Sequence, residues 1–156
     1  KHLLKRFPNA KFNFIHINPV DVYLSTDNFF KKMMPYLRLQ QIGKEERQQS
    51  IIDLYKTIMK DFFDQKALIP EGQYSEISFD NLEQTPLKCV EHIYKALNLE
   101  GYDAAKPHFQ SFIDKMKSYE KNQHVISKSQ MESLLVQLRP SMEAFGYEIP
   151  EHIQVV

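Results

Sequence analysis

The residues from Asn18 to Thr26 have types and a spacing that suit anion binding. They follow an apolar run from Phe12 to Ile17 and open a helical pattern. A strand, a short polar turn and a helix start often form an anion site, because free backbone N–H groups and the positive end of the helix dipole point at one spot. Ser25 lies about one turn inside this helix and can add a hydroxyl donor. The segment therefore predicts a binding site for phosphate or a similar anion.

The elements that must position this site are helices and a few short strands. Apolar residues three or four positions apart indicate helices, and apolar residues at alternating positions indicate strands. The pattern predicts strands at 12–17 and 74–79. It predicts helices at 21–34, where Pro35 ends the helix, and at 44–65, and further helices that begin at Thr85-Pro86, Asp103 and Ser127. Gln130 completes a capping box with Ser127, and the tail from Pro140 is predicted to be irregular. Two strands do not form a stable sheet alone. We therefore expect further strands before Lys1, and interpret residues 1–156 as the C-terminal portion of a single α/β domain.

The composition excludes several classes of function. The chain has 156 residues and 20 basic against 20 acidic side chains, so no general affinity for nucleic acid or an anionic membrane is indicated. No apolar run approaches the roughly 18 residues of a membrane span. The single cysteine, Cys89, cannot form an internal disulfide, which fits a reducing compartment such as the cytoplasm. His92, His108 and His124 have no cysteine or carboxylate at ligand spacing, so we predict no metal site.

The turn resembles the nucleotide-binding core of the sulfotransferase family, which uses 3′-phosphoadenosine 5′-phosphosulfate (PAPS) as donor. In that family a strand ends in a turn of the type Arg-x-Pro-x-Asp, followed by Ser, and the Arg and Ser hold the 3′-phosphate. Pro19, Asp21 and Ser25 match this pattern, and Asn18 stands in the turn. The resemblance implies that these four residues bind the donor nucleotide.

Two later stretches continue the resemblance. The run 76–82, between Leu68-Ile69-Pro70-Glu71-Gly72 and Thr85-Pro86-Leu87, is similar to the family's strand with a Tyr-Glu-Asp-Leu pattern, whose aromatic residue helps to form the adenine pocket. Phe79 occupies that place. Tyr119, Lys121 and Asn122 resemble the loop that closes basic side chains over the nucleotide.

The chain departs from the family pattern at two points. The 5′-phosphosulfate loop is absent: the family places it upstream of this region, together with the usual catalytic base, so the catalytic residues are unknown. No arginine lies between Arg6 and Arg38. Either Ile17 stands where the Arg belongs, or a Val-Arg pair is missing before Asn18. In both cases a charge-assisted phosphate contact worth about 1.5–3 kcal/mol is lost.

The resemblance implies a P-loop nucleotide-binding-like, three-layer α/β fold and an enzyme that moves a sulfuryl group from PAPS to a hydroxyl or amine. The partner would be a small-molecule or glycan acceptor, and the oligomeric state is open. We expect a cytoplasmic location, although membrane-anchored relatives exist whose anchor would lie upstream. Two other readings stay open: a non-catalytic binding or interaction module of the same fold, and a P-loop kinase-like phosphotransferase.

Each of these residues also has a purely structural interpretation. Ser25 can be a surface hydroxyl, and Pro19 and Asp21 can be ordinary turn and cap residues. Phe79 can be a core residue, and Lys121 a solvated charge. His16, on an apolar strand, fits a buried structural histidine better than a base.

Overall fold

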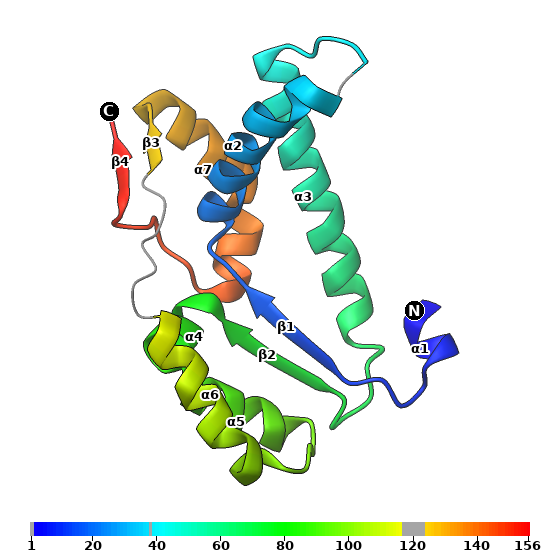
Figure 1. The fold of residues 1–156 in the computed structure, drawn as a ribbon. Coiled ribbons are helices and arrows are strands. Elements are labelled where there is room, and N and C mark those ends of the chain that lie inside the picture. Colours follow the sequence, from blue (N-terminus) through cyan, green and yellow to red (C-terminus); the bar gives the residue numbers. More distant parts are fainter. Residues whose placement is uncertain (1, 38, 117–123) are drawn as a thin grey trace. The chain divides into compact units, whose positions relative to one another are not determined.

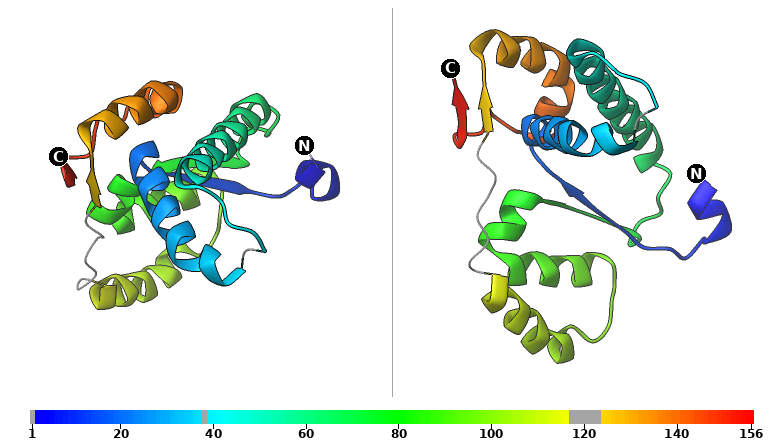
Figure 2. Two further views of the ribbon diagram at one scale, coloured as in Figure 1. Left: turned by 90° about the horizontal axis from the view of Figure 1, so that it is seen from above. Right: turned by 45° about the horizontal axis from the view of Figure 1, so that its top comes forward.

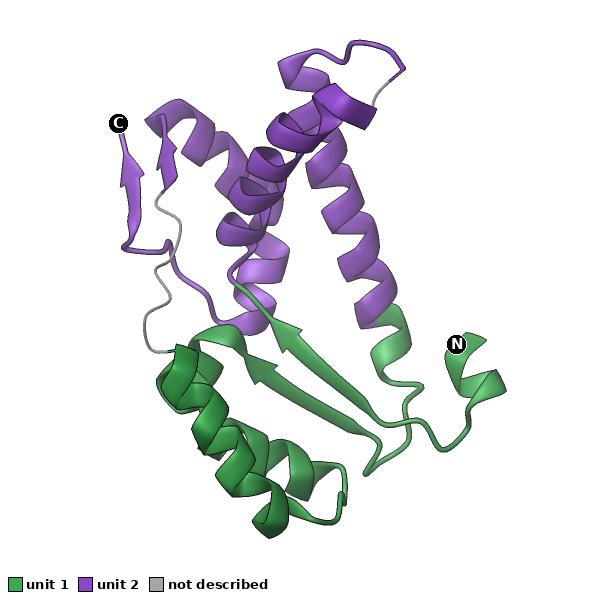
Figure 3. Ribbon diagram, viewed as in Figure 1, with its two compact units in different colours: residues 1–17, 64–121 green, residues 18–63, 122–156 purple. Residues whose placement is uncertain are grey.

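The structure is a computed structural model that describes residues 2–37, 39–116 and 124–156 (Figure 1). The chain forms two compact units, which we describe separately (Figure 3). Unit 1 comprises residues 1–17 and 64–121, and unit 2 comprises residues 18–63 and 122–156. Each unit is therefore assembled from two separate stretches of the sequence.

The described residues form helices and short strands in a mixed, helix-rich α/β arrangement. In chain order they are α1 (His2–Arg6), β1 (Phe12–His16), α2 (Pro19–Leu37), α3 (Lys44–Lys66), β2 (Tyr74–Ser78), α4 (Phe79–Gln84), α5 (Pro86–Ala96), α6 (Tyr102–Met116), β3 (His124–Ile126), α7 (Lys128–Phe145) and β4 (Ile153–Val155). None of the helices in these ranges is long and apolar enough to cross a lipid bilayer.

Unit 1 contains a parallel pair of strands, β1 and β2, which lie side by side in the views of Figures 1 and 2. The register pairs Phe12 with Tyr74 and His16 with Ser78. Helices α4 and α5 pack against β2, and α6 packs on α5. Burial alternates along β1, and Ile15 is 41% exposed. One face of β1 is therefore more exposed than the other.

Ser78 ends β2 and begins a helix that the sequence pattern did not predict. Its hydroxyl accepts a hydrogen bond from the N–H of Asn81 at 3.1 Å and so caps α4. Phe79 is consequently the first residue of α4 rather than the last residue of the strand. At the next helix, Pro86 occupies the first position as predicted, but the Thr85 hydroxyl donates to the Asn81 carbonyl at 3.1 Å instead of capping α5.

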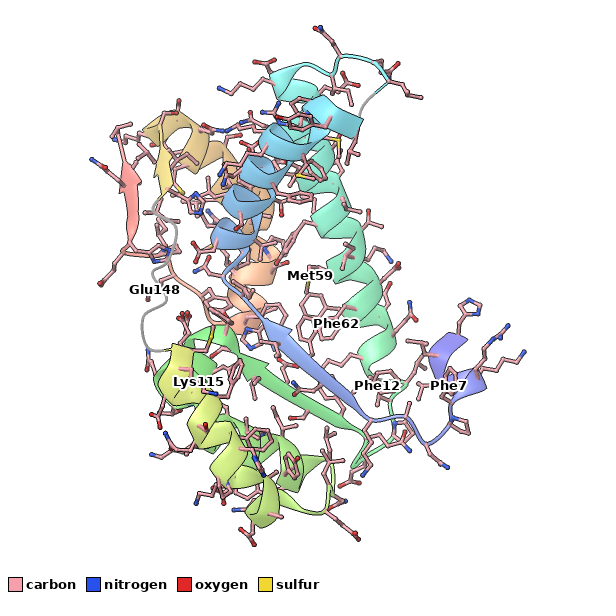
Figure 4. All side chains as sticks on the ribbon, in the orientation of Figure 1. Phe7, Phe12, Met59, Phe62, Lys115 and Glu148 are labelled. Atoms are coloured by element: carbon pink, nitrogen blue, oxygen red, sulfur yellow. The ribbon has the colours of Figure 1, made fainter. Side chains whose placement is uncertain are left out.

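The core of unit 2 joins α2, α3 and α7. Its buried side chains are Val20, Tyr23, Leu24, Ile51, Ile52, Ile126, Met131, Leu134, Leu138, Met142 and Ile153. Met59 and Phe62 point from the same side of α3 (Figure 4), and the Phe62 and Phe145 rings lie 6.4 Å apart. The Ser127 hydroxyl accepts from the N–H of Gln130 at 3.3 Å, which confirms half of the predicted capping box at the start of α7.

Two proline positions were predicted wrongly. Helix α2 continues through Pro35 to Leu37, since a proline so near the helix end removes one bond from a turn that is about to stop. Helix α7 continues through Pro140 to Phe145. Leu138 and Met142 are both buried in the core, so packing on either side of Pro140 outweighs the lost hydrogen bond.

The tail is not irregular as predicted, because it adds a second two-stranded sheet to unit 2. Strands β3 and β4 pair in parallel, from His124 with Ile153 to Ile126 with Val155. The N–H of Val156 donates to the Ile126 carbonyl at 2.9 Å. The described residues thus contain four strands rather than two.

Ser75 in β2 offers a stability test. Its side chain is 3% exposed, and its hydroxyl has no hydrogen-bond partner among the described residues. We expect Ser75→Ala to raise the free energy of unfolding by up to about 1 kcal/mol, because an unpartnered buried hydroxyl is removed. Ser78→Ala is the matched control and should lower it by about 1 kcal/mol, because α4 loses its cap. Urea denaturation checks both values, and a destabilised Ser75→Ala would show that the hydroxyl has a partner.

Candidate functional site

Asn18 organises the start of α2. Its side-chain oxygen accepts from the N–H of Val20 at 3.0 Å, and its amide nitrogen donates to the Glu148 carbonyl at 2.7 Å. The residue is 7% exposed. Both side-chain groups are therefore used inside unit 2, and Asn18 acts here as the helix cap.

This cap leaves few backbone donors for an anion. Pro19 has no N–H, the Val20 N–H is taken by Asn18, and the Val22 N–H donates to the Asn18 carbonyl at 3.0 Å. Among the first four helical positions, only Asp21 has an N–H group without an acceptor in the described part of the chain. The helix start is a weaker anion site than the sequence pattern predicts.

Asp21 places a negative charge at this point. Its carboxylate lies 2.9 Å from Nε2 of His152, and both side chains are partly exposed. An acidic residue in the first turn is favourable to the helix dipole, but its negative charge opposes the binding of a phosphate. His152 comes from a position 131 residues away in the sequence, and no local pattern could have indicated it.

Ser25 is exposed on α2. It follows Asp21 by four residues, so the two side chains lie on one side of the helix, one turn apart. The first two turns of α2 thus bring together Asn18, Pro19, Asp21 and Ser25 within unit 2.

The remaining predicted residues lie elsewhere. Phe79 belongs to unit 1, where it is half-buried and lines an apolar cavity between α4, α5 and α6. Tyr119, Lys121 and Asn122 lie outside the described residues. Ile17, one candidate for the position of the family's arginine, is 40% exposed.

Unit 1 also carries a group of titratable side chains that the sequence did not reveal. Lys66 donates to Oε2 of Glu76 at 2.5 Å, and the Tyr74 hydroxyl donates to the same oxygen. Burial alone raises the pKa of Glu76, but these hydrogen bonds outweigh burial and hold it below its ordinary value. Burial and the neighbouring carboxylate both raise the pKa of Tyr74. Glu76 is therefore ionised and Tyr74 protonated at neutral pH.

His16 lies at the end of β1, opposite Ser78 in the strand register. Burial lowers its pKa, and the charges of Glu76 and Asp80 only partly offset this effect. The ring of this half-buried residue is consequently neutral at pH 7. The alternation Tyr74–Glu76–Ser78 indicates a polar strand face, but the parallel register that brings it beside His16 cannot be inferred from sequence.

Within the described ranges, no group of three or more His, Cys, Asp or Glu side chains is placed to hold a metal ion. The first two turns of α2 offer hydroxyl, N–H and carboxylate groups. A hydroxyl and an N–H donor fit a phosphate, and the Asp21 carboxylate weakens that fit.

Comparison with known proteins places these residues in a family context. The sequence pattern of the sulfotransferase family matches residues 1–104, which include the start of α2 and Phe79. Two curated relatives are similar at 22% identity over 148 residues: the omega-hydroxy-beta-dihydromenaquinone-9 sulfotransferases of Mycobacterium bovis and Mycobacterium tuberculosis. The match covers 95% of this chain and 38% of each relative, so the chain spans well under half of their length. No solved structure matches. The family match covers two thirds of the sequence, and the chain belongs to the sulfotransferase family.

Proposed function

We propose that this chain is part of a sulfotransferase that moves a sulfuryl group from PAPS to a hydroxyl or amine acceptor. In this proposal the chain supplies the side of the site that holds the 3′-phosphate and the adenine, within a three-layer P-loop-like fold. The supporting observation is the exposed Ser25 hydroxyl, one turn after Asp21 on the Asn18-capped helix α2, inside the region that matches the family.

The residues of the chain would then have distinct roles. The donor supplies the sulfuryl group and carries the phosphate that has to be held. The Ser25 hydroxyl and the Asp21 N–H donate hydrogen bonds to phosphate oxygens, while Asn18 fixes the helix start through Val20 and Glu148. Phe79 offers a ring for the adenine. These fixed N–H and O–H groups hold PAPS in line with the acceptor for transfer. This positioning lowers the barrier to direct transfer, and no covalent intermediate forms.

The acceptor class follows from chemistry and from the relatives. The mycobacterial relatives are named for an omega-hydroxylated quinone derivative. We therefore favour a hydroxyl acceptor over an amine for the whole protein.

Ser25→Ala tests the phosphate role. We expect the variant to bind adenosine 3′,5′-bisphosphate about tenfold more weakly than the unchanged chain, since a hydrogen bond to a charged group is lost. Calorimetric titration measures both affinities. Thr26→Val is the matched control, because the Thr26 hydroxyl donates to the Val22 carbonyl at 2.7 Å within the helix, and its loss should leave nucleotide affinity unchanged.

Two results would count against the proposal. Equal affinity in Ser25→Ala and the unchanged chain would remove Ser25 from the site. No measurable nucleotide binding in any form of the chain would favour the non-catalytic relative of the family instead.

A further inference from the structure

The end of helix α2 and its connection to α3 expose several large apolar side chains of unit 2. Tyr36 is 85% exposed, Leu37 is 64% exposed, and Leu39 is fully open to water. Met33 and Ile42 are also exposed. Figure 3 shows this segment protruding from one end of unit 2. We call these residues together the α2–α3 tip.

The helical part of the α2–α3 tip faces away from the core. Met33, Tyr36 and Leu37 are three or four positions apart, so their side chains share one side of the helix. Tyr23 and Phe30 serve the other side, where Tyr23 is buried and Phe30 packs against the core. A gathered group of exposed apolar side chains usually marks a binding surface. The α2–α3 tip therefore has the character of an interface.

The charge around the α2–α3 tip is positive, although the charges of the whole chain balance. At positions 28–44 the charged residues are Lys31, Lys32, Arg38 and Lys44, and none is acidic. Lys31 forms an ion pair with a buried aspartate of its own helix. Lys32 and Lys44 are exposed, and neither forms an ion pair with another described residue. The net charge of zero thus hides a local basic surface that borders the apolar one.

Helix α3 offers a comparison without this charge. Leu54 and Ile58 are also exposed apolar side chains. The charges along this part of α3 are of both signs and come from Asp53, Lys56, Lys60 and Asp61. Apolar exposure coincides with an excess of positive charge at the α2–α3 tip and not around Ile58.

We propose that the α2–α3 tip docks on the surface of an anionic phospholipid bilayer. Leu37 and Leu39 enter the boundary between the headgroups and the acyl chains, and Tyr36 lies at the headgroup level, where amphipathic rings are favoured. Lys32 and Lys44 lie near the lipid phosphates. This surface adds a membrane contact to the chain and does not depend on the proposed sulfuryl transfer.

A second copy of the chain is the competing occupant. In a symmetric dimer the same patch of each copy meets the other. Lys32 and Lys44 would then approach the same cations of the other copy, and like charges repel. An anionic bilayer instead supplies the opposite charge together with an apolar interior, so it fits both parts of the surface.

The experiment uses a fluorescent reporter inside the α2–α3 tip. The chain has no tryptophan, so Tyr36→Trp introduces a single one. We expect its emission to shift to shorter wavelength, in a saturable way, on addition of vesicles made of phosphatidylglycerol and phosphatidylcholine in equal parts. Vesicles of phosphatidylcholine alone should bind about tenfold or more weakly. Ile58→Trp is the matched control, because Ile58 is 55% exposed and lies about 21 Å along α3 from Lys44, and its emission should not change.

Further variants of Tyr36→Trp separate the apolar and the electrostatic contributions. Leu39→Ala should weaken binding to the anionic vesicles about tenfold, since apolar surface no longer enters the bilayer. Lys32→Gln together with Lys44→Gln should weaken it about twentyfold and remove most of the difference between the two lipids. Ile58→Ala should leave the affinity unchanged. These side chains are exposed, and far-UV circular dichroism checks that each variant keeps its helix content.

Four results would overturn the inference. They are the absence of an emission shift with either kind of vesicle, equal binding to the charged and the uncharged vesicles, and equal losses of binding in Leu39→Ala and Ile58→Ala. The fourth is an emission shift that appears without vesicles as the concentration of the chain rises, because a second copy would then cover the α2–α3 tip. None of these measurements involves a nucleotide, so their outcome is separate from that of Ser25→Ala.

Discussion

Leu138→Ala is expected to lower the free energy of unfolding of the chain by about 3 kcal/mol. Leu138 is 1% exposed and lies in α7, where it belongs to the core that joins α7 to α2 and α3. Truncation removes buried methyl groups and leaves a cavity that surrounding helices fill only in part. Urea denaturation followed by far-UV circular dichroism measures the loss.

Val136→Ala is the control on the same helix. Val136 is 69% exposed, so its truncation should change the free energy of unfolding by less than about 0.5 kcal/mol. Similar losses in Leu138→Ala and Val136→Ala would contradict the assignment of Leu138 to the centre of this core.

Asp27→Ala is expected to lower the free energy of unfolding by about 2–3 kcal/mol, near the lower end for breaking a buried ion pair. Asp27 is 4% exposed, and its carboxylate contacts Lys31 at 2.7 Å and Arg47 at 2.9 Å. Arg47 lies in α3 and its side chain is 18% exposed, so the substitution leaves a largely buried guanidinium beside a methyl group. Lys31 is half exposed, and Lys31→Ala should cost less than about 1 kcal/mol.

The contribution of Asp27 should depend on pH. Burial alone raises the pKa of Asp27, but hydrogen bonds from Lys31 and Arg47 outweigh burial and hold it below its ordinary value of 3.8. A carboxyl group whose folded pKa is lowered stabilises the fold above its ordinary pKa and loses this contribution as pH falls through the folded pKa. The difference in unfolding free energy between the unchanged chain and Asp27→Asn should therefore be constant above about pH 5 and shrink below pH 4. A constant difference down to pH 2 would contradict the ion pair.

The longer elements could be predicted because their patterns are local. Apolar spacing predicted a helix at 44–65, and α3 spans Lys44–Lys66. The apolar run before Asn18 predicted a strand, and β1 ends at His16. Helix caps at Ser127 and prolines at first positions are also local signals, and the structure confirms both at α7 and α5.

The missed elements depend on distant partners. Strands β3 and β4 have three residues each, too few to show a period, and they pair across the whole length of α7. Helix α7 continues through Pro140 because of the core around it, which no local pattern reports.

The candidate site, too, could be predicted from the sequence only where its residues are neighbours in the chain. The turn around Pro19 and Ser25 was visible because strand, turn and helix adjoin in the sequence. The Glu148 carbonyl and His152, which contact Asn18 and Asp21, come from the other end of unit 2. These contacts decide how much of the helix start is open to a phosphate, and they could be found only in three dimensions.

The discontinuous sequence of unit 2 has a consequence for synthesis on the ribosome. Residues 18–63 leave the exit tunnel long before residues 122–156, which complete the same unit. Until α7 and Ile153 emerge, the apolar faces of α2 and α3 lack much of their final packing partner. Nascent chains with uncovered apolar faces are prone to aggregate and are the usual clients of chaperones. Unit 2 can therefore complete its core only after residues 122–156 have been synthesised, and the apolar faces of its first half stay uncovered during that interval.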